Sequence, residues 1–215
     1  MSAFFTDLIT ATDESRRDFE NHPVVLDAVA HGLTLARYRR LLIELYHIVW
    51  HFNPLCAAAA SRMPDAERDV RYFLYEHMHE ESGHEQWVLN DLEAMGVSRA
   101  EATASKPGIY TSTLCGYNYW SADRGNPCSV LGMMYTLEVI ASVYGGAFSA
   151  AIREALLLEG DQGVSFVSSH ATMDAQHMIE LRQVLNTVAA PESRAAVVAS
   201  TMVNFHHFTR MFESL

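Results

Sequence analysis

The chain is short of basic residues, of cysteine and of charge in general. Lysine and arginine together number 15 against 26 acidic residues, which leaves a formal net charge of −11. Nucleic-acid binding needs a basic surface for the phosphates, so this balance argues against nucleic acid as a partner. The three cysteines (Cys56, Cys115 and Cys128) form no CxxC pair, and their odd number argues against a disulfide framework and against a thiolate metal site.

The first residues lack the basic region of a secretory signal. Residues 1–15 contain three acids and neither lysine nor arginine, so we expect a cytoplasmic protein. Residues 129–151 are nearly all apolar or small and are long enough to span a bilayer. Glu138 lies near the middle of that stretch, where a carboxylate is costly in lipid. We therefore interpret the stretch as a buried helix and expect no membrane partner.

No proline-rich linker, repeat or strand-rich pattern divides the 215 residues. Helical spacing and capping residues predict helices over 3–20, 23–31, 35–60 (kinked at Pro54), 64–95, a short segment after Ser98, 128–158, 161–187 and from Pro191 onward. Residues 106–127, rich in Gly, Pro, Asn, Ser and Tyr, are expected to be at least partly non-helical. The sequence thus predicts an all-α fold in which residues 1–215 form a single domain, a bundle of seven or eight helices.

Two of the predicted helices repeat one spacing of histidine and acid. The pattern H-x3-[DE]-x2-H occurs at His77, Glu81 and His84, and again at His170, Asp174 and His177. At 3.6 residues per turn, such positions lie within roughly 60° of one another on the helix surface. An isolated acid–histidine pair of this kind is more often a solvated helix face, but two matching triplets favour a shared site.

Glu138 strengthens this interpretation because it lies in so apolar a helix. No lysine or arginine occurs between Arg124 and Arg153, and an uncompensated buried carboxylate costs several kcal/mol. Glu138 must therefore be paired, protonated or bound to metal. Mixed carboxylate and imidazole ligands without cysteine favour iron or manganese, and this many candidates suit two irons better than one catalytic zinc.

The order of these residues is also that of ferritin-like di-iron bundles. Those bundles use Glu residues and Glu-x-x-His motifs that project inward from their helices. Here the matching order is Glu44, Glu81-x2-His84, Glu138 and Asp174-x2-His177, with Asp in place of the last Glu. That reading leaves His170 unexplained.

Several stretches resemble the heme-oxygenase-like superfamily, which includes TenA and PqqC proteins. The opening of that superfamily resembles His22-Pro23-Val24-Val25, Gly32-Leu33-Thr34 and the stretch 38–47. Its non-heme di-iron branch has a ligand set similar to His84, Glu138 and His170-x3-Asp174-x2-His177. The resemblance covers about residues 20–210 and implies a seven-helix bundle, commonly a homodimer, with two iron ions in its central cavity.

One position departs from that branch. A Glu usually stands seven residues before the first ligand histidine, and this chain has His77 there. Either His77 replaces the carboxylate as a ligand, or Glu81, one turn along the same face, takes its place.

The resemblance implies an iron-dependent oxidoreductase that activates O2 to oxidise a small amine, amino acid or carboxylic acid, with manganese as the alternative metal. The branch includes enzymes that decarboxylate fatty acids, oxygenate amines, fragment amino acids or form p-aminobenzoate. By similarity to TenA-like relatives, Glu44 and His47 are expected to contact substrate, and Glu44 is a candidate further ligand.

Two other functions remain open at this point. One is a ferritin-like iron-binding protein or ferroxidase that transforms no organic substrate. The other is a TenA-like binding or hydrolytic protein without metal, whose histidines and acids only line a polar pocket.

Overall fold

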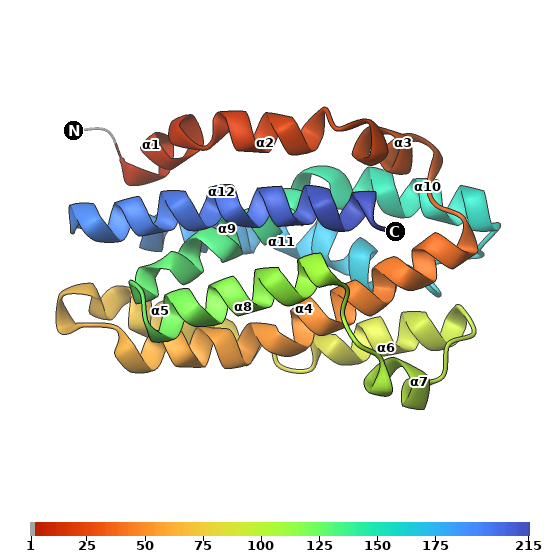
Figure 1. Cartoon of the computed structure of the whole chain (residues 1–215), viewed down its shortest axis with the longest axis horizontal. Helices are drawn as coiled ribbons and strands as arrows, with labels where there is room; N and C mark the ends of the chain where they lie inside the picture. The colour runs from red at the N-terminus through yellow and green to blue at the C-terminus, as the bar shows by residue number, and fades with distance from the viewer. Residues whose placement is uncertain (1–2) are drawn as a thin grey trace.

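Helices make up all the regular secondary structure of residues 3–215 (Figure 1). This computed structural model describes the backbone of those residues and the side chains of residues 3–170 and 176–215. The prediction of an all-α bundle is confirmed. The α-helices in chain order are α1 (Phe4–Ala11), α2 (Asp13–Glu20), α3 (Pro23–His31), α4 (Leu35–Arg62), α5 (Arg68–Glu80), α6 (His84–Ala94), α7 (Arg99–Ala104), α8 (Ile109–Asp123), α9 (Val130–Ile140), α10 (Gly146–Leu156), α11 (Ser165–Leu185) and α12 (Pro191–Glu213).

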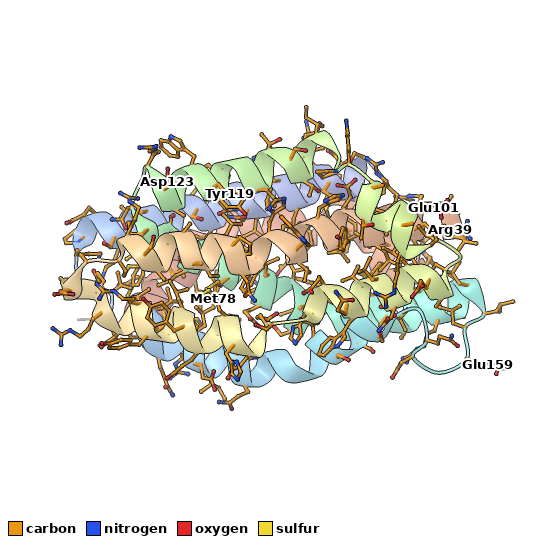
Figure 2. All side chains as sticks on the ribbon, turned by 90° about the horizontal axis from the view of Figure 1, so that it is seen from below. Arg39, Met78, Glu101, Tyr119, Asp123 and Glu159 are labelled. Atoms are coloured by element: carbon orange, nitrogen blue, oxygen red, sulfur yellow. The ribbon has the colours of Figure 1, made fainter. Side chains whose placement is uncertain are left out.

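The long helices run roughly along the long axis of the molecule (Figure 1). The longest, α4, has 28 residues and packs on α5, α6 and α8. On the other side of the bundle α12 contacts α8, α9 and α2, and the first three helices lie along its outer face (Figure 1). Arg39 and Glu101 lie at the same end of the molecule (Figure 2), where Nε of Arg39 donates to the carbonyl of Met95 at 2.5 Å. The start of α4 is thereby fixed to the end of α6.

The predicted helix over 64–95 is two helices, α5 and α6, joined by a turn at residues 81–83. Gly83 adopts a φ of +96° at the N-cap of α6, a conformation that residues with a Cβ rarely adopt. The sequence pattern missed this break because helical spacing continues across it. A similar break at Thr12 divides the predicted helix over 3–20 into α1 and α2.

The stretch 106–127 is more helical than we expected, because α8 occupies most of it. Its turn-forming residues are accommodated by tertiary packing against α4 and α12. Asn118 is buried, and its side-chain amide donates to the Leu114 carbonyl and to Oδ1 of Asn204 on α12, both at 2.9 Å. Buried hydrogen bonds of this kind replace the local interactions that make asparagine favour turns.

Residues 127–156 form one apolar helical run with a π-helical turn, η3 (Ala141–Gly145), between α9 and α10. By length and hydropathy this run resembles a membrane span, yet 67% of its most apolar window is buried inside the protein, as in a core helix. At Gly132 a Cβ would lie 2.4 Å from the Val197 carbonyl oxygen, so glycine permits the close contact with α12. The π-turn begins three residues after Glu138, and π-turns occur frequently at functional sites.

Candidate metal centre

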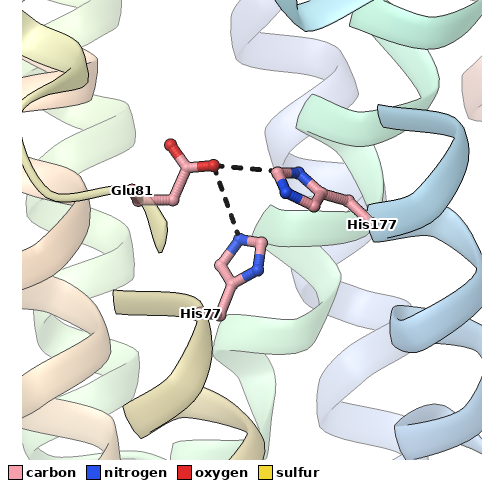
Figure 3. A group of neighbouring side chains, drawn as sticks. All are labelled: His77, Glu81 and His177. Carbon is pink, nitrogen blue, oxygen red and sulfur yellow. Dashed lines mark ion pairs between the residues drawn. The ribbon is translucent and has the colours of Figure 1, made fainter. Parts of the chain in front are cut away.

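The carboxylate of Glu81 lies between two pairs of histidines. Its Oε1 is 3.9 Å from Nε2 of His77 and 3.8 Å from Nδ1 of His177 (Figure 3). Its Oε2 is 2.7 Å from Nδ1 of His84 and 3.9 Å from Nε2 of His170. Each oxygen of this one carboxylate therefore faces its own pair of imidazoles.

Two overlapping triads result, and Glu81 belongs to both. In each triad the potential ligand atoms lie within 4.8 Å of one another; the triads are His77–Glu81–His177 and Glu81–His84–His170. The side chains of the four histidines are at most 12% exposed. The sequence left His77 and Glu81 as alternatives, and the structure brings both to the cluster.

Glu138 reaches the same cluster from α9. Its Oε1 lies 3.5 Å from Nδ1 of His177, and its side chain is 9% exposed. Among the described ion pairs Glu138 has this histidine partner and no lysine or arginine. As the sequence predicted, carboxylates and imidazoles meet from separate helices, here α5, α6, α9 and α11 together with the turn at Glu81.

Neighbouring side chains hold the imidazole rings in fixed orientations. The Phe73 ring stacks on His77, with ring centroids 5.4 Å apart, and the Trp87 ring stacks on His84 at 4.0 Å. His170 Nδ1 lies 2.8 Å from the Phe166 carbonyl, which can only accept, so Nδ1 carries the proton. Nε2 of His170, on the side of Glu81, is then the nitrogen that can bind a metal, and a second nitrogen fixed by a carbonyl is typical of metal-binding histidines.

Burial sets the charges of the cluster. It lowers the pKa of His77 to about 4, so that imidazole is neutral at neutral pH. Burial opposes ionisation of Glu81, but the imidazoles of His170 and His84 outweigh it and hold the pKa of that carboxyl well below its usual range. For Glu138 burial prevails over His177, and its pKa is raised.

The donor set fits a pair of transition-metal ions. Neutral imidazoles and carboxylates are ligands for iron and manganese, and a carboxylate with one oxygen toward each triad suits two ions. In the described part of the chain, Nδ1 of His77 and Oε2 of Glu138 are buried without a hydrogen-bond partner. Buried polar atoms are normally satisfied, so these two favour a ligand at the cluster.

The remaining predicted site residues fall into two groups. Asp174 is part of α11, but its side chain lies outside the described residues, so its place as a ligand stays a prediction. Glu44 and His47 are described, and the structure does not bring them to the cluster or to the cavity beside it.

Glu44 and His47 instead contact the segment that leads into α8. Glu44 forms an ion pair with Arg40 at 2.8 Å and accepts the N–H of Gly108, the N-cap of α8. Nε2 of His47 lies 2.9 Å from Oγ of Ser105. Substrate contact by these two residues stays a prediction; in the structure their side chains contact the segment that leads into α8 and do not line the cavity.

The sequence analysis missed Glu80 and Asp91. Oε2 of Glu80 lies 3.9 Å from Nδ1 of His77 and 3.8 Å from Nε2 of His177, although its side chain is half exposed. Asp91 is fully buried on α6 and accepts the N–H groups of Ser165 and Phe166 at 3.0 and 2.8 Å. It thereby caps α11, the helix of His170 and His177. The signal in the sequence was an acid among the apolar positions of α6.

We expect Asp91→Ala to loosen the ligand arrangement as well as the fold. Loss of the cap and of buried hydrogen bonds to a charged group lowers the free energy of unfolding by about 2–4 kcal/mol. Asp91→Asn keeps one acceptor oxygen and is expected to lose about half as much. Urea unfolding and competition titration with Co²⁺ measure both effects; unchanged Co²⁺ affinity in a folded Asp91→Ala protein would contradict the positioning role.

Comparison with known proteins shows the family and the fold of this chain. The family model described as iron-containing redox enzyme matches residues 39–205. A domain of unknown function with a heme oxygenase-like fold from Shewanella denitrificans is 28% identical, with a TM-score of 0.84 over 98% of this chain and 90% of that chain. No curated protein matches this sequence.

More distant structures share the same fold. A TenA homolog from Pseudomonas syringae is 14% identical, with a TM-score of 0.81 over 98% of this chain and 91% of that chain. A heme oxygenase from Leptospira interrogans is 15% identical, with a TM-score of 0.80 over the full length of both chains. The predicted heme oxygenase-like fold is confirmed.

Proposed function

Because the chain belongs to the family of iron-containing redox enzymes, we propose that it is a non-heme di-iron oxidase or oxygenase. Its reaction would activate O2 to oxidise a small organic substrate, an amine, an amino acid or a carboxylic acid. The observation that carries this proposal is the position of Glu81, with one carboxylate oxygen toward each pair of buried histidines.

The described residues form two sets of ligands, one for each ion. His84 and His170 with Oε2 of Glu81 would hold one ion, and His77 and His177 with Oε1 of Glu81 would hold the other. Glu138, beside His177, would complete the second position. Bound iron supplies the electrons that O2 chemistry requires.

The surrounding residues contribute orientation and exclusion of water. Phe73 and Trp87 fix the rings that they stack on, and the Phe166 carbonyl fixes the tautomer of His170. An apolar cavity adjoins the cluster and gives an organic substrate a place beside it. This cavity favours an enzyme over a ferroxidase, which needs no such space.

Metal analysis and oxygen uptake test the proposal. Anaerobically reconstituted protein is expected to bind about two iron ions per chain and to consume O2 when reduced. His84→Ala and His177→Ala each remove a ligand from one triad and should abolish O2 consumption, whereas the exposed His79→Ala should not. Iron-free protein with full activity would refute the proposal, and iron uptake without any substrate-coupled turnover would favour the ferritin-like function.

Three further expectations stay predictions. They are a homodimer, a cytoplasmic location, and iron in preference to manganese. Sedimentation of the purified chain and metal competition during reconstitution address the first and the last.

A further inference from the structure

The cavity beside the candidate metal centre is lined by polar side chains at one end and mostly by apolar side chains elsewhere. It has a volume of about 140 Å³ and is bounded by residues of α2, α3, α4, α5, α9, η3, α10, α11 and α12 and by the turn at Glu81. The charged and imidazole side chains in the lining all belong to the candidate metal centre; they are His77, Glu81, Glu138 and His170. None of the described lining residues is a lysine or an arginine. A ligand there meets polar groups chiefly at the metal centre.

The apolar lining follows one face of α4 away from the cluster. The face consists of Leu41, Leu45, Ile48, Val49 and Phe52. Phe52 marks the cluster end, because its ring lies 5.6 Å from that of His77. From Phe52 back to Leu41 the helix rises about 16 Å. The cavity is thus elongated along the bundle.

Two phenylalanines stand at the other end. Phe148 lies ten residues after Glu138 on the same helical run, which corresponds to about 15 Å. Its ring packs against Phe212 at 6.3 Å and against Tyr38 at 6.4 Å, and both phenylalanines line the cavity. Tyr38 is itself fully buried and donates its hydroxyl to the Gly163 carbonyl at 2.8 Å. Phe148 is therefore held in position at the far end of the cavity by Phe212 and Tyr38.

We propose that this cavity binds a molecule with one polar end at the metal centre and a hydrocarbon body directed along α4, and that Phe148 and Phe212 determine how long that body can be. The proposal deepens the function proposed above and rests on it only for the role of the polar end. Burial of the hydrocarbon body supplies the affinity. Each buried methylene group contributes about 0.8 kcal/mol, which tightens the dissociation constant about fourfold. Once the hydrocarbon chain of the ligand reaches Phe148 and Phe212, further methylene groups add no affinity, because displacing packed aromatic side chains costs free energy.

Calorimetric titration of the metal-free protein tests the proposal independently of redox activity. The probes are linear alkanoates, alkylamines and alkanols from hexyl to tetradecyl. We expect affinity to rise about fourfold per methylene up to one chain length and to fall beyond it. The three end groups show which polar end the histidines and carboxylates of the metal-free cluster accept.

Variants of the far wall then locate the limit. Phe148→Leu and Phe148→Ala are expected to move the limit to longer chains and to raise the affinity for the first excluded probe about fourfold or more. Phe205→Leu is the matched control, because Phe205 is buried on α12 and does not line the cavity. Phe148→Leu keeps most of the packing and serves if the alanine variant does not fold.

The outcomes separate this inference from the proposed function. A length limit that shifts in the Phe148 variants but not in Phe205→Leu supports the inference, even if the iron-loaded protein consumes no O2. Absence of binding by all probes, or a limit unchanged in both Phe148 variants, overturns it, even if the protein binds iron and consumes O2.

Discussion

Glu81→Ala is expected to remove both metal ions from the protein. Each oxygen of this carboxylate faces a different histidine pair, so its loss deprives both triads of a ligand at once. Iron content should fall from about two ions per chain to nearly none, and O2 consumption should fall with it. Elemental analysis after anaerobic reconstitution and gel filtration measures the loss directly.

Two other variants make the result specific. His77→Ala removes a ligand from one triad only and is expected to leave about one ion per chain. Glu76→Ala, an exposed carboxylate one helical turn before Glu80, is the matched control and should retain the full iron content. If Glu81→Ala instead kept one ion, the carboxylate would belong to a single site.

Glu138→Gln is expected to change stability in opposite directions with and without metal. Without metal, Glu138 is a buried carboxylate with a histidine as its ion-pair partner, and burial raises its pKa. The neutral amide removes the cost of that charge, so the metal-free variant should gain about 1–2 kcal/mol, or roughly 3–6 °C in Tm. With iron bound, the variant loses a charged ligand and should gain less from metal than the wild type does.

The pH dependence checks the cause of this effect. A raised pKa means that the folded state binds the proton more tightly than the unfolded chain does. The destabilisation by Glu138 is therefore absent below its ordinary pKa of 4.5 and complete once the pH exceeds the raised value. The advantage of metal-free Glu138→Gln should shrink as the pH falls toward 4.5. An advantage that does not depend on pH would mean that packing, not charge, causes it.

Much of the fold and of the candidate metal centre could be predicted from the sequence. Helical spacing identified the long elements, and the repeated H-x3-[DE]-x2-H pattern identified residues that the structure brings together, although the first triplet spans the turn between α5 and α6. Glu138 was found through a different physical signal, a carboxylate among apolar residues with no basic residue nearby. Both signals are local in the chain, which is why sequence alone contains them.

The parts that could not be predicted depend on contacts between distant segments. The positive φ of Gly83 turns the chain after Glu81 and lets that residue face two histidine pairs, whereas continuous spacing indicated one helix. Similarity to TenA-like relatives led to the expectation that Glu44 contacts substrate, but it gave no sign of the ion pair with Arg40 and the bond to Gly108 by which Glu44 stabilises the start of α8. Which elements pack on the polar face and on the apolar face of α4 is decided by segments distant in the chain, which local spacing does not show.

The π-turn η3 separates Glu138, which lies at the candidate metal centre, from Phe148, which lies at the far wall of the cavity. Such a turn holds one residue more than an α-helical segment of the same length, so gaining or losing a single codon there rotates everything downstream by about 100°. In this way related proteins could differ in the shape of the cavity while keeping all the candidate metal-binding residues. A reactive centre and its choice of substrate can then diverge separately on one continuous helix.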